Sequence, residues 1–194
     1  SETATSAGRG RLIVLDPGHG GIDGGKKGIN GAEEKEINLQ ISLIIKELLE
    51  KENVEVVMTR SDENRIGEDR VSDLKARVDI MNRENPVLAV SIHQNSYHEE
   101  SVHGAQVFYY SESKEGARAA SMLQEALREA DPENTKEAKA NDTYYILKKT
   151  EVPTVIAECG FLSNYEEAEK LITEDYQRKM AEAIVKGILQ YIEE

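Results

Sequence analysis

The chain of 194 residues has the length of a single domain and can bury a substantial hydrophobic core. It carries 37 acidic against 24 basic residues, and the net charge of −13 has the wrong sign for a nucleic-acid-binding protein. A mean hydropathy of −0.56, without an apolar run near the about 18 residues of a membrane span, excludes a membrane-embedded protein. With the single cysteine Cys159 the chain forms no internal disulfide, so any metal site must use histidine and carboxylate ligands.

The first ten residues, 1–10, differ from the rest of the chain because they are small and polar. We expect a disordered tail or an expression remnant there. They lack the basic and then apolar pattern of a signal peptide, which leaves open that an export signal has been removed. Over residues 11–194 no linker interrupts the pattern of strands and helices, and we expect one catalytic domain.

Short apolar runs predict strands at residues 11–16, 54–59, 87–92, 104–110 and 153–158. Apolar residues at helical spacing predict helices over 34–52, around 74–81, over 115–130, and twice after Ser163, with Glu166 and Glu167 as capping-box partners at the first of these two. The glycine-rich segment 18–31 and the charged segment 131–141 are expected to be loops, the second one mobile. The alternation predicts a single-domain α/β fold with a mainly parallel sheet and helices on both faces.

Three of the predicted strands are followed by a side chain that can bind a metal or move a proton. These are His19, His93 and Glu158. Each alone has an ordinary interpretation as a hydrogen-bonded histidine or a solvated glutamate, but functional groups of such sheets gather at the carboxyl ends of the strands. Their coincidence there favours one common site. The other histidines, His98 and His103, lie in a polar segment and are second-choice ligands.

A mononuclear catalytic zinc commonly takes two histidines and one glutamate, so a carboxylate is needed near the first histidine. Glu33, Glu34 and Glu36 compete for this position. At ~100° per residue, the centre of the apolar helix face lies about 36° from Glu34, about 64° from Glu33 and more than about 100° from Glu36. Glu34 therefore points most nearly inward, and the helix dipole favours its anionic form. Ordinary acidic enrichment of a helix start remains the alternative.

The segment Gly20 to Lys26 also matches the core of a phosphate-binding loop. However, Lys27 replaces the Ser or Thr that would hold Mg²⁺, and the next residues do not begin a helix. A nucleotide would thus lack the helix N-terminus that binds its phosphates, and we reject nucleotide binding.

Four segments, in family order, resemble the zinc-dependent N-acetylmuramoyl-L-alanine amidases of the Amidase_3 family. They are LDPGHGG (15–21), EKEINL (34–39), SIHQNS (91–96) and AECGFLSN (157–164), within a resemblance that runs from residue 11 to the C-terminus. It implies a twisted, mainly parallel sheet flanked by helices, with Zn²⁺ bound by His19, Glu34 and His93. It also implies that Glu158 is the catalytic carboxylate in hydrolysis of the amide between N-acetylmuramic acid and the L-alanine of peptidoglycan.

The run 143–164 is most similar to the cortex amidases of sporulation and germination, which implies a part in forming muramic δ-lactam. The resemblance further implies export to the cell wall or the forespore intermembrane space, with peptidoglycan as the partner and room for a protein that localises or activates the enzyme. A zinc peptidase acting within the stem peptide would need the same ligands. A noncatalytic cell-wall-binding module is a third hypothesis, but it would have no need of a buried base at Glu158.

Four further residues near these motifs have structural interpretations. Arg60 and Arg77 are expected to form ion pairs, and Asp16 to stabilise the turn before Pro17 rather than to orient a histidine. Cys159 is expected to pack in the core on the sheet face opposite Glu158.

Overall fold

A computed structural model describes residues 11–194, and the tail expected over residues 1–10 lies outside this range. The sheet has the strand order β2-β1-β3-β6-β4-β5. Pairing is parallel among β2, β1, β3 and β6, whereas β4 runs antiparallel to β6. The strands are β1 (Leu12–Pro17), β2 (Glu55–Met58), β3 (Leu88–Asn95), β4 (Gln106–Tyr109), β5 (Lys139–Ala140) and β6 (Thr154–Phe161). The predicted α/β fold with a mainly parallel sheet is confirmed.

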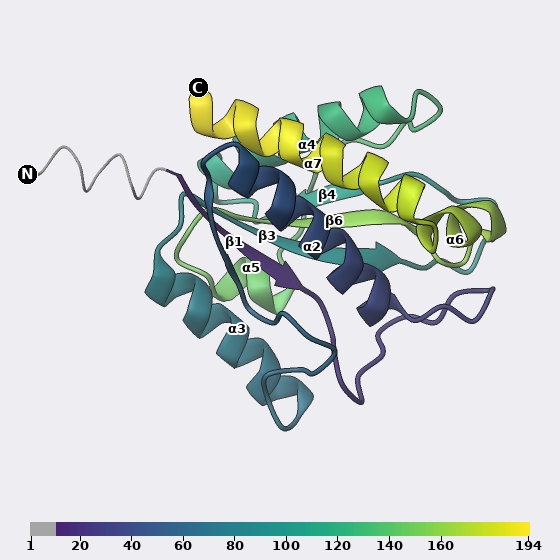
Figure 1. Cartoon of the computed structure of the whole chain (residues 1–194), viewed down its shortest axis with the longest axis horizontal. Helices are drawn as coiled ribbons and strands as arrows, with labels where there is room; N and C mark the ends of the chain where they lie inside the picture. Colours follow the sequence, from purple (N-terminus) through teal and green to yellow (C-terminus); the bar gives the residue numbers. More distant parts are fainter. Residues whose placement is uncertain (1–10) are drawn as a thin grey trace, which may run out of the picture.

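Helices cover both faces of the sheet, as predicted (Figure 1). On one face lie α2 (Glu34–Lys51), α4 (Lys114–Ala130) and α7 (Glu174–Glu193), with α6 (Tyr165–Leu171) after β6. The other face carries α3 (Arg70–Glu84) and the short α5 (Tyr145–Lys149). Neither α5 nor the two-residue β5 was predicted, because both are too short to show a periodic pattern.

Helix α2 positions one of the candidate ligands because its apolar face is buried against the sheet and α7. Ile37, Ile41, Ile45 and Leu49 recur at helical spacing and are almost completely buried in the core cluster that also contains the inner strands β1 and β3. The same face, continued to the first turn, holds Glu34. Burial of the apolar stripe therefore fixes the rotation of the helix and the direction of this carboxylate.

A fully buried arginine ties α3 to the end of β1. Arg77 contacts Asp16 at 2.9 Å and Asp73 at 2.8 Å, and it donates to the carbonyl oxygen of His19 at 2.6 Å. The ion pairing expected for Arg77 is confirmed. Arg60 differs: it donates to backbone carbonyl oxygens, Pro17 O among them, and forms no ion pair with any of the residues described.

Arg77→Met should lower the free energy of unfolding by about 3–5 kcal/mol, because it leaves the buried Asp16 carboxylate without its counter-charge. Urea unfolding followed by circular dichroism measures the change. Arg83→Met is the control on the same helix, since the Arg83 side chain is 67% exposed and its loss should stay within about 0.5 kcal/mol of wild type. Equal stability of the two variants would contradict a structural role for the Arg77 cluster.

Two smaller expectations concern the segment around β6. Cys159 is fully buried in the core, as expected. The capping box predicted at α6 is only half formed. The Asn164 side chain accepts a hydrogen bond from the backbone N–H of Glu167, as in a capping box. The Glu167 carboxylate does not bond back to the helix start and accepts from the backbone N–H groups of Gly104 and Phe161. Glu167 thus joins α6 to the sheet region rather than closing its own helix end.

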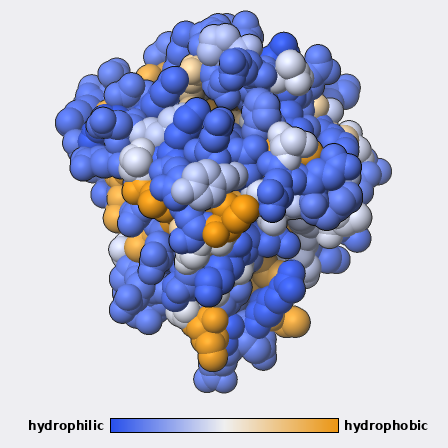
Figure 2. Space-filling view, turned by 90° about the vertical axis from the view of Figure 1, so that its right-hand side faces the viewer, coloured by the Kyte–Doolittle hydropathy of each residue, from blue (hydrophilic) through white to orange (hydrophobic). Residues whose placement is uncertain are grey.

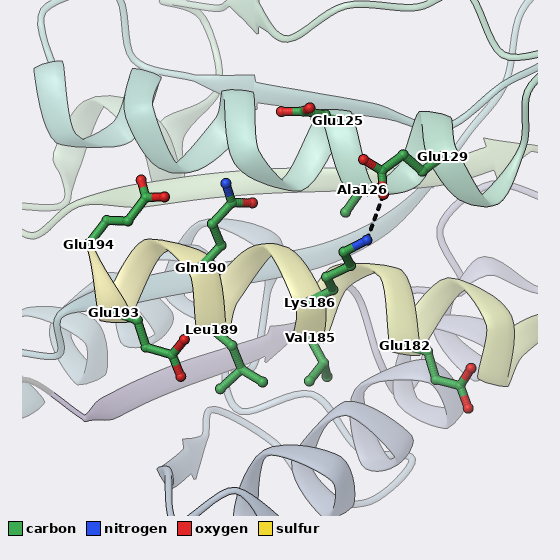
Figure 3. A pocket seen from close by; sticks show the side chains of 10 residues that line it. All are labelled: Glu125, Ala126, Glu129, Glu182, Val185, Lys186, Leu189, Gln190, Glu193 and Glu194. Atoms are coloured by element: carbon green, nitrogen blue, oxygen red, sulfur yellow. Dashed lines mark hydrogen bonds and ion pairs between the residues drawn. The ribbon is translucent and has the colours of Figure 1, made fainter.

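The outer surface between α4 and α7 is rich in acidic residues. Between α4 and α7, several glutamates and Lys186 line a shallow groove, with Lys186 paired to Glu129 at 2.6 Å (Figure 3). Figure 2 shows a face on which hydrophilic residues dominate and hydrophobic ones form only small separate patches. Over residues 11–194, no helix combines the length and the apolar character needed to cross a bilayer.

Candidate metal centre and active site

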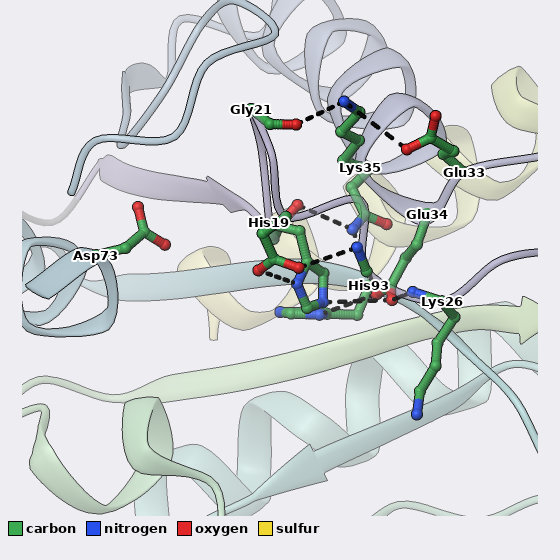
Figure 4. A network of polar contacts seen from close by, with 12 residues as sticks. His19, Gly21, Lys26, Glu33, Glu34, Lys35, Asp73 and His93 are labelled. Atoms are coloured by element: carbon green, nitrogen blue, oxygen red, sulfur yellow. Dashed lines mark hydrogen bonds and ion pairs between the residues drawn. The ribbon is translucent and has the colours of Figure 1, made fainter. Parts of the chain in front are cut away.

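The structure brings together three of the residues singled out in the sequence. His19 follows β1, Glu34 opens α2 and His93 lies on β3, and one ligand atom from each is within 4.8 Å of the others. The Nε2 atom of His19 is 3.3 Å from Glu34 Oε1, and the Nδ1 atom of His93 is 3.2 Å from Glu34 Oε2 (Figure 4). The carboxylate therefore lies between two imidazoles whose ring planes are nearly perpendicular, at 83°.

His93 was expected just past the end of its strand and Glu158 at the end of its own, but the structure places both inside longer strands. They are register partners between β3 and β6, and the pairing continues to Asn95 and Phe161 after a bulge. Backbone hydrogen bonds extend the strands past the point where the apolar residues end, which hydropathy cannot indicate. The two side chains still lie in the carboxyl halves of neighbouring parallel strands.

The glycine-rich loop after β1 is shaped to let backbone approach the ligand side chains. His19 itself has a φ of 63°, in the left-handed region that non-glycine residues adopt at an energetic cost. A Cβ atom on Gly18 would overlap the imidazole of His93, and one on Gly25 would overlap both Glu34 Oε1 and the ring of His19. The glycines are therefore required by close packing around the three side chains rather than by a bound phosphate.

Glu34 is held as an anion inside the protein. Only 1% of the residue is exposed, and its oxygens accept hydrogen bonds from the backbone N–H groups of Lys26 at 2.8 Å and Gln94 at 3.0 Å. Burial raises the pKa of Glu34, but contacts with the two histidines outweigh it and hold the pKa well below the usual range. By contrast, the Glu33 side chain is 46% exposed and approaches Lys35. The inward direction predicted for Glu34 is confirmed.

Each histidine is also held from its far side. His19 Nδ1 lies 2.8 Å from Asp23 Oδ2, and His93 Nε2 lies 2.9 Å from the hydroxyl of Ser91, which in turn donates to Asp16 at 2.6 Å. In the tautomer in which His19 Nδ1 donates to Asp23 and His93 Nε2 donates to Ser91, the nitrogens His19 Nε2 and His93 Nδ1 are free to bind a cation in place of their contacts with Glu34. Asp16 forms no hydrogen bond with either imidazole: it is joined to His93 through Ser91 and also interacts with it by charge.

The sequence analysis missed both supporting residues, for different reasons. Ser91 precedes His93 by two positions on a strand, so period-2 alternation placed the two on one face and was a usable signal. Asp23 reaches His19 across an irregular loop whose course no periodicity predicts. His98 and His103, the second-choice ligands, are exposed and do not join the cluster.

Glu158 has the environment of a proton-transfer group. The residue is 7% exposed, and its Oε2 atom is buried without a hydrogen-bond partner among residues 11–194. Burial first, and then the negative charge of Glu34, raise the pKa of Glu158 well above its usual range, while the charge of Lys26 lowers it. A buried carboxylate oxygen with no partner is costly unless a bound group or water supplies one.

The cluster opens into a cavity of about 520 Å³, a volume common for ligand sites. His19 and His93 lie on one wall, and the residues 143–146 around the start of α5 form part of the other. This arrangement is typical of metal-dependent hydrolases. Two imidazoles and a buried carboxylate lie at the carboxyl side of a mainly parallel sheet, and a second carboxylate is free to move a proton.

Comparison with known proteins gives the family. Residues 13–190 match the Amidase_3 model, described as N-acetylmuramoyl-L-alanine amidase. The chain is 35% identical to the germination-specific N-acetylmuramoyl-L-alanine amidase of Bacillus subtilis (strain 168), over 95% of this chain and 81% of that protein. The chain belongs to the Amidase_3 family of N-acetylmuramoyl-L-alanine amidases, enzymes that act on peptidoglycan.

Solved structures agree with this assignment. The CwlD amidase from Clostridioides difficile, in complex with the GerS lipoprotein, is 36% identical with a TM-score of 0.91 and covers 94% of this chain and 98% of its own. The amidase AmiC2 of Nostoc punctiforme is 32% identical with a TM-score of 0.86, over 95% of this chain and 98% of its own. The sheet and its covering helices are thus those of peptidoglycan amidases.

Proposed function

We propose that the chain hydrolyses the amide bond between N-acetylmuramic acid and L-alanine with one bound Zn²⁺. In this proposal His19, Glu34 and His93 hold the ion and Glu158 is the general base and acid. The observation that carries it is the cluster of three ligand atoms within 4.8 Å, in which His93 is the register partner of Glu158, a buried carboxyl whose Oε2 atom has no hydrogen-bond partner among residues 11–194.

The residues present fit zinc. Two imidazole nitrogens and a carboxylate oxygen are a common three-ligand set for catalytic zinc, which leaves a further position for water or substrate. Asp23 and Ser91 lie within hydrogen-bond distance of the far ring nitrogens of His19 and His93, and as acceptors of N–H groups there they would leave the nitrogens nearest Glu34 free to bind the ion. A bound cation would also offset the negative charge of Glu34, which raises the pKa of Glu158.

The mechanism assigns the proton transfers to Glu158. When bound, zinc supplies Lewis acidity that polarises a carbonyl group and lowers the pKa of water. Glu158 accepts the proton of the attacking water and then donates it to the nitrogen of the leaving L-alanine. Burial raises the pKa of this carboxyl, which favours the protonated form that it takes after accepting the proton of water. Glu34 remains ionised throughout, as its hydrogen bonds require.

Product analysis of digested peptidoglycan tests this function. The purified protein, with its zinc content measured by mass spectrometry, is incubated with cell-wall peptidoglycan, and new amino termini are identified. New L-alanine termini, together with peptide-free glycan strands, support the amidase. New termini elsewhere in the stem peptide would identify a peptidase, and binding without cleavage by the zinc-loaded protein would identify a noncatalytic wall-binding module.

We further propose a role in the spore cortex, with export to the cell wall or the forespore intermembrane space. The similarity to a germination-specific amidase supports the role. A protein that localises or activates the enzyme is part of the proposal, supported by the complex of the similar CwlD amidase with a lipoprotein. Formation of muramic δ-lactam from cortex peptidoglycan, by this enzyme together with a deacetylase, tests the role.

Asp23→Ala should weaken zinc binding about 10- to 100-fold, because His19 loses the acceptor that fixes its ring orientation. Titration with a competing chelator measures the affinity. Asp79→Ala, which removes an exposed carboxylate on α3, is the control and should bind zinc as tightly as wild type. Unchanged affinity in Asp23→Ala would show that Asp23 does not support a metal ligand.

A further inference from the structure

The cavity beside the candidate metal ligands is lined by a lysine whose ammonium group forms no ion pair with any described residue. Lys26 lines the cavity, and its backbone N–H bonds to Glu34 Oε1 at 2.8 Å. Its side chain is exposed and forms no ion pair within residues 11–194, although the chain has 37 acidic residues. Figure 4 shows the ammonium group extending away from the other labelled side chains. Lys26 is also the lysine of the phosphate-loop match at Gly20 to Lys26, which was rejected as a nucleotide site. The anion that its ammonium group could bind is therefore not a nucleotide phosphate.

The position of Glu158 indicates which part of a substrate lies near Lys26. Glu158 must reach the leaving nitrogen to protonate it, so the departing peptide lies on the Glu158 side of the reacting bond. Lys26 lines the cavity, and its charge lowers the pKa of Glu158, in keeping with an ammonium on this side. Two arginines also line the cavity: Arg77 is paired with Asp16 and Asp73, and Arg70 acts on Asp23, which contacts His19. Among these three cations, Lys26 is the one available to a departing peptide.

We propose that the Lys26 ammonium binds a carboxylate of the stem peptide on the leaving side, so that the enzyme prefers muramoyl peptides in which the residue after L-alanine has a free carboxylate. This inference rests on the proposed amidase function. Lys26 acts as a positioning residue and touches none of the reacting atoms. An ammonium–carboxylate contact within a cavity is a charge-assisted hydrogen bond, and we expect a preference of about tenfold.

Two substrates that differ in one group measure this preference. They are muramoyl-L-alanyl-γ-D-glutamyl-L-lysine, in which the α-carboxylate of the second residue is free, and the corresponding D-isoglutaminyl tripeptide, in which that group is a neutral amide. In both substrates the γ-carboxyl group of the second residue is in a peptide bond. For the zinc-loaded wild type, we expect kcat/KM to be about tenfold higher for the acid. In Lys26→Gln the acid-to-amide ratio should fall to about one, whereas Lys26→Arg should keep most of it.

Lys27→Gln is the matched control, because Lys27 is the exposed neighbour of Lys26 and does not line the cavity. It should retain the wild-type ratio. The ratio separates recognition from indirect effects, since a change in the pKa of Glu158 or in zinc content alters both substrates equally. Calorimetric binding of the two free tripeptides to the same variants provides a readout without turnover, and only the tripeptide with the free α-carboxylate on its second residue should lose affinity in Lys26→Gln.

The two failures are distinguishable. Equal kcat/KM for acid and amide in the wild type, or an unchanged ratio in Lys26→Gln, would overturn the role of Lys26 and leave the amidase function standing. Absence of cleavage of the muramoyl–alanine bond in either substrate by the zinc-loaded wild type would overturn the proposed function, and with it the inference.

Discussion

Glu158→Gln should reduce peptidoglycan hydrolysis by about 10²- to 10⁴-fold while zinc stays bound. The amide of glutamine nearly matches the carboxyl in size and fills the same buried position, but it cannot accept the proton of the attacking water. Release of L-alanine amino termini and zinc content are measured on the same samples. Wild-type rates in the zinc-replete variant would show that Glu158 is not the base.

Loss of activity in this variant should not come from unfolding. The pKa of Glu158 is raised by burial in the folded protein, so at neutral pH the folded state bears the cost of ionising this group, and stability falls as pH rises from the unfolded pKa toward the folded one. Glutamine removes this cost, and metal-free Glu158→Gln should be at least as stable as wild type at pH 7. Glu166→Gln, an exposed change on α6, controls for loss of one negative charge.

Glu34→Gln should lower zinc affinity by more than about 100-fold. Substitution of a residue that only supports a metal ligand costs up to about 100-fold, and the loss of a ligand should cost more. The substitution keeps the size of the side chain and one oxygen, but it removes the buried negative charge between His19 and His93. Zinc content after dialysis and affinity against a competing chelator are the measurements.

Glu33→Gln is the matched control, because Glu33 directly precedes Glu34 and its side chain is partly exposed beside Lys35. It should bind zinc like wild type. Greater loss of zinc from Glu33→Gln than from Glu34→Gln would mean that the carboxylate direction in the structure is not the one used for binding. Full zinc content in both variants would remove Glu34 from the ligand set.

The sequence predicted those parts of the fold and site that depend on regular periodicity. The apolar face of α2 was sufficient to rank Glu34 above its acidic neighbours, because a helix repeats the same rotation at each residue. Alternation of strands with helices was likewise sufficient for the mainly parallel sheet, which brings His93 and Glu158 together on adjacent strands.

Features that depend on irregular chain or on distant packing were not predicted. Asp23 reaches His19 only through the course of the glycine-rich loop. The wall of the cavity at residues 143–146 is set by α5, a helix of 5 residues whose position comes from packing of Ile146 and Leu147 against the sheet. Sequence patterns of this length do not distinguish a short helix from a turn.

The three candidate ligands come from separate parts of the fold, with Glu34 and His93 59 positions apart. Their side chains meet only where β3 pairs with β1 beneath α2, and a contact of such long range costs more loop-closure entropy than the local contacts of a helix. In small zinc domains the metal ion is needed for folding itself. Here we expect a bound metal ion to stabilise a site that the folded chain has already built, and to shift the equilibrium toward the folded state by mass action.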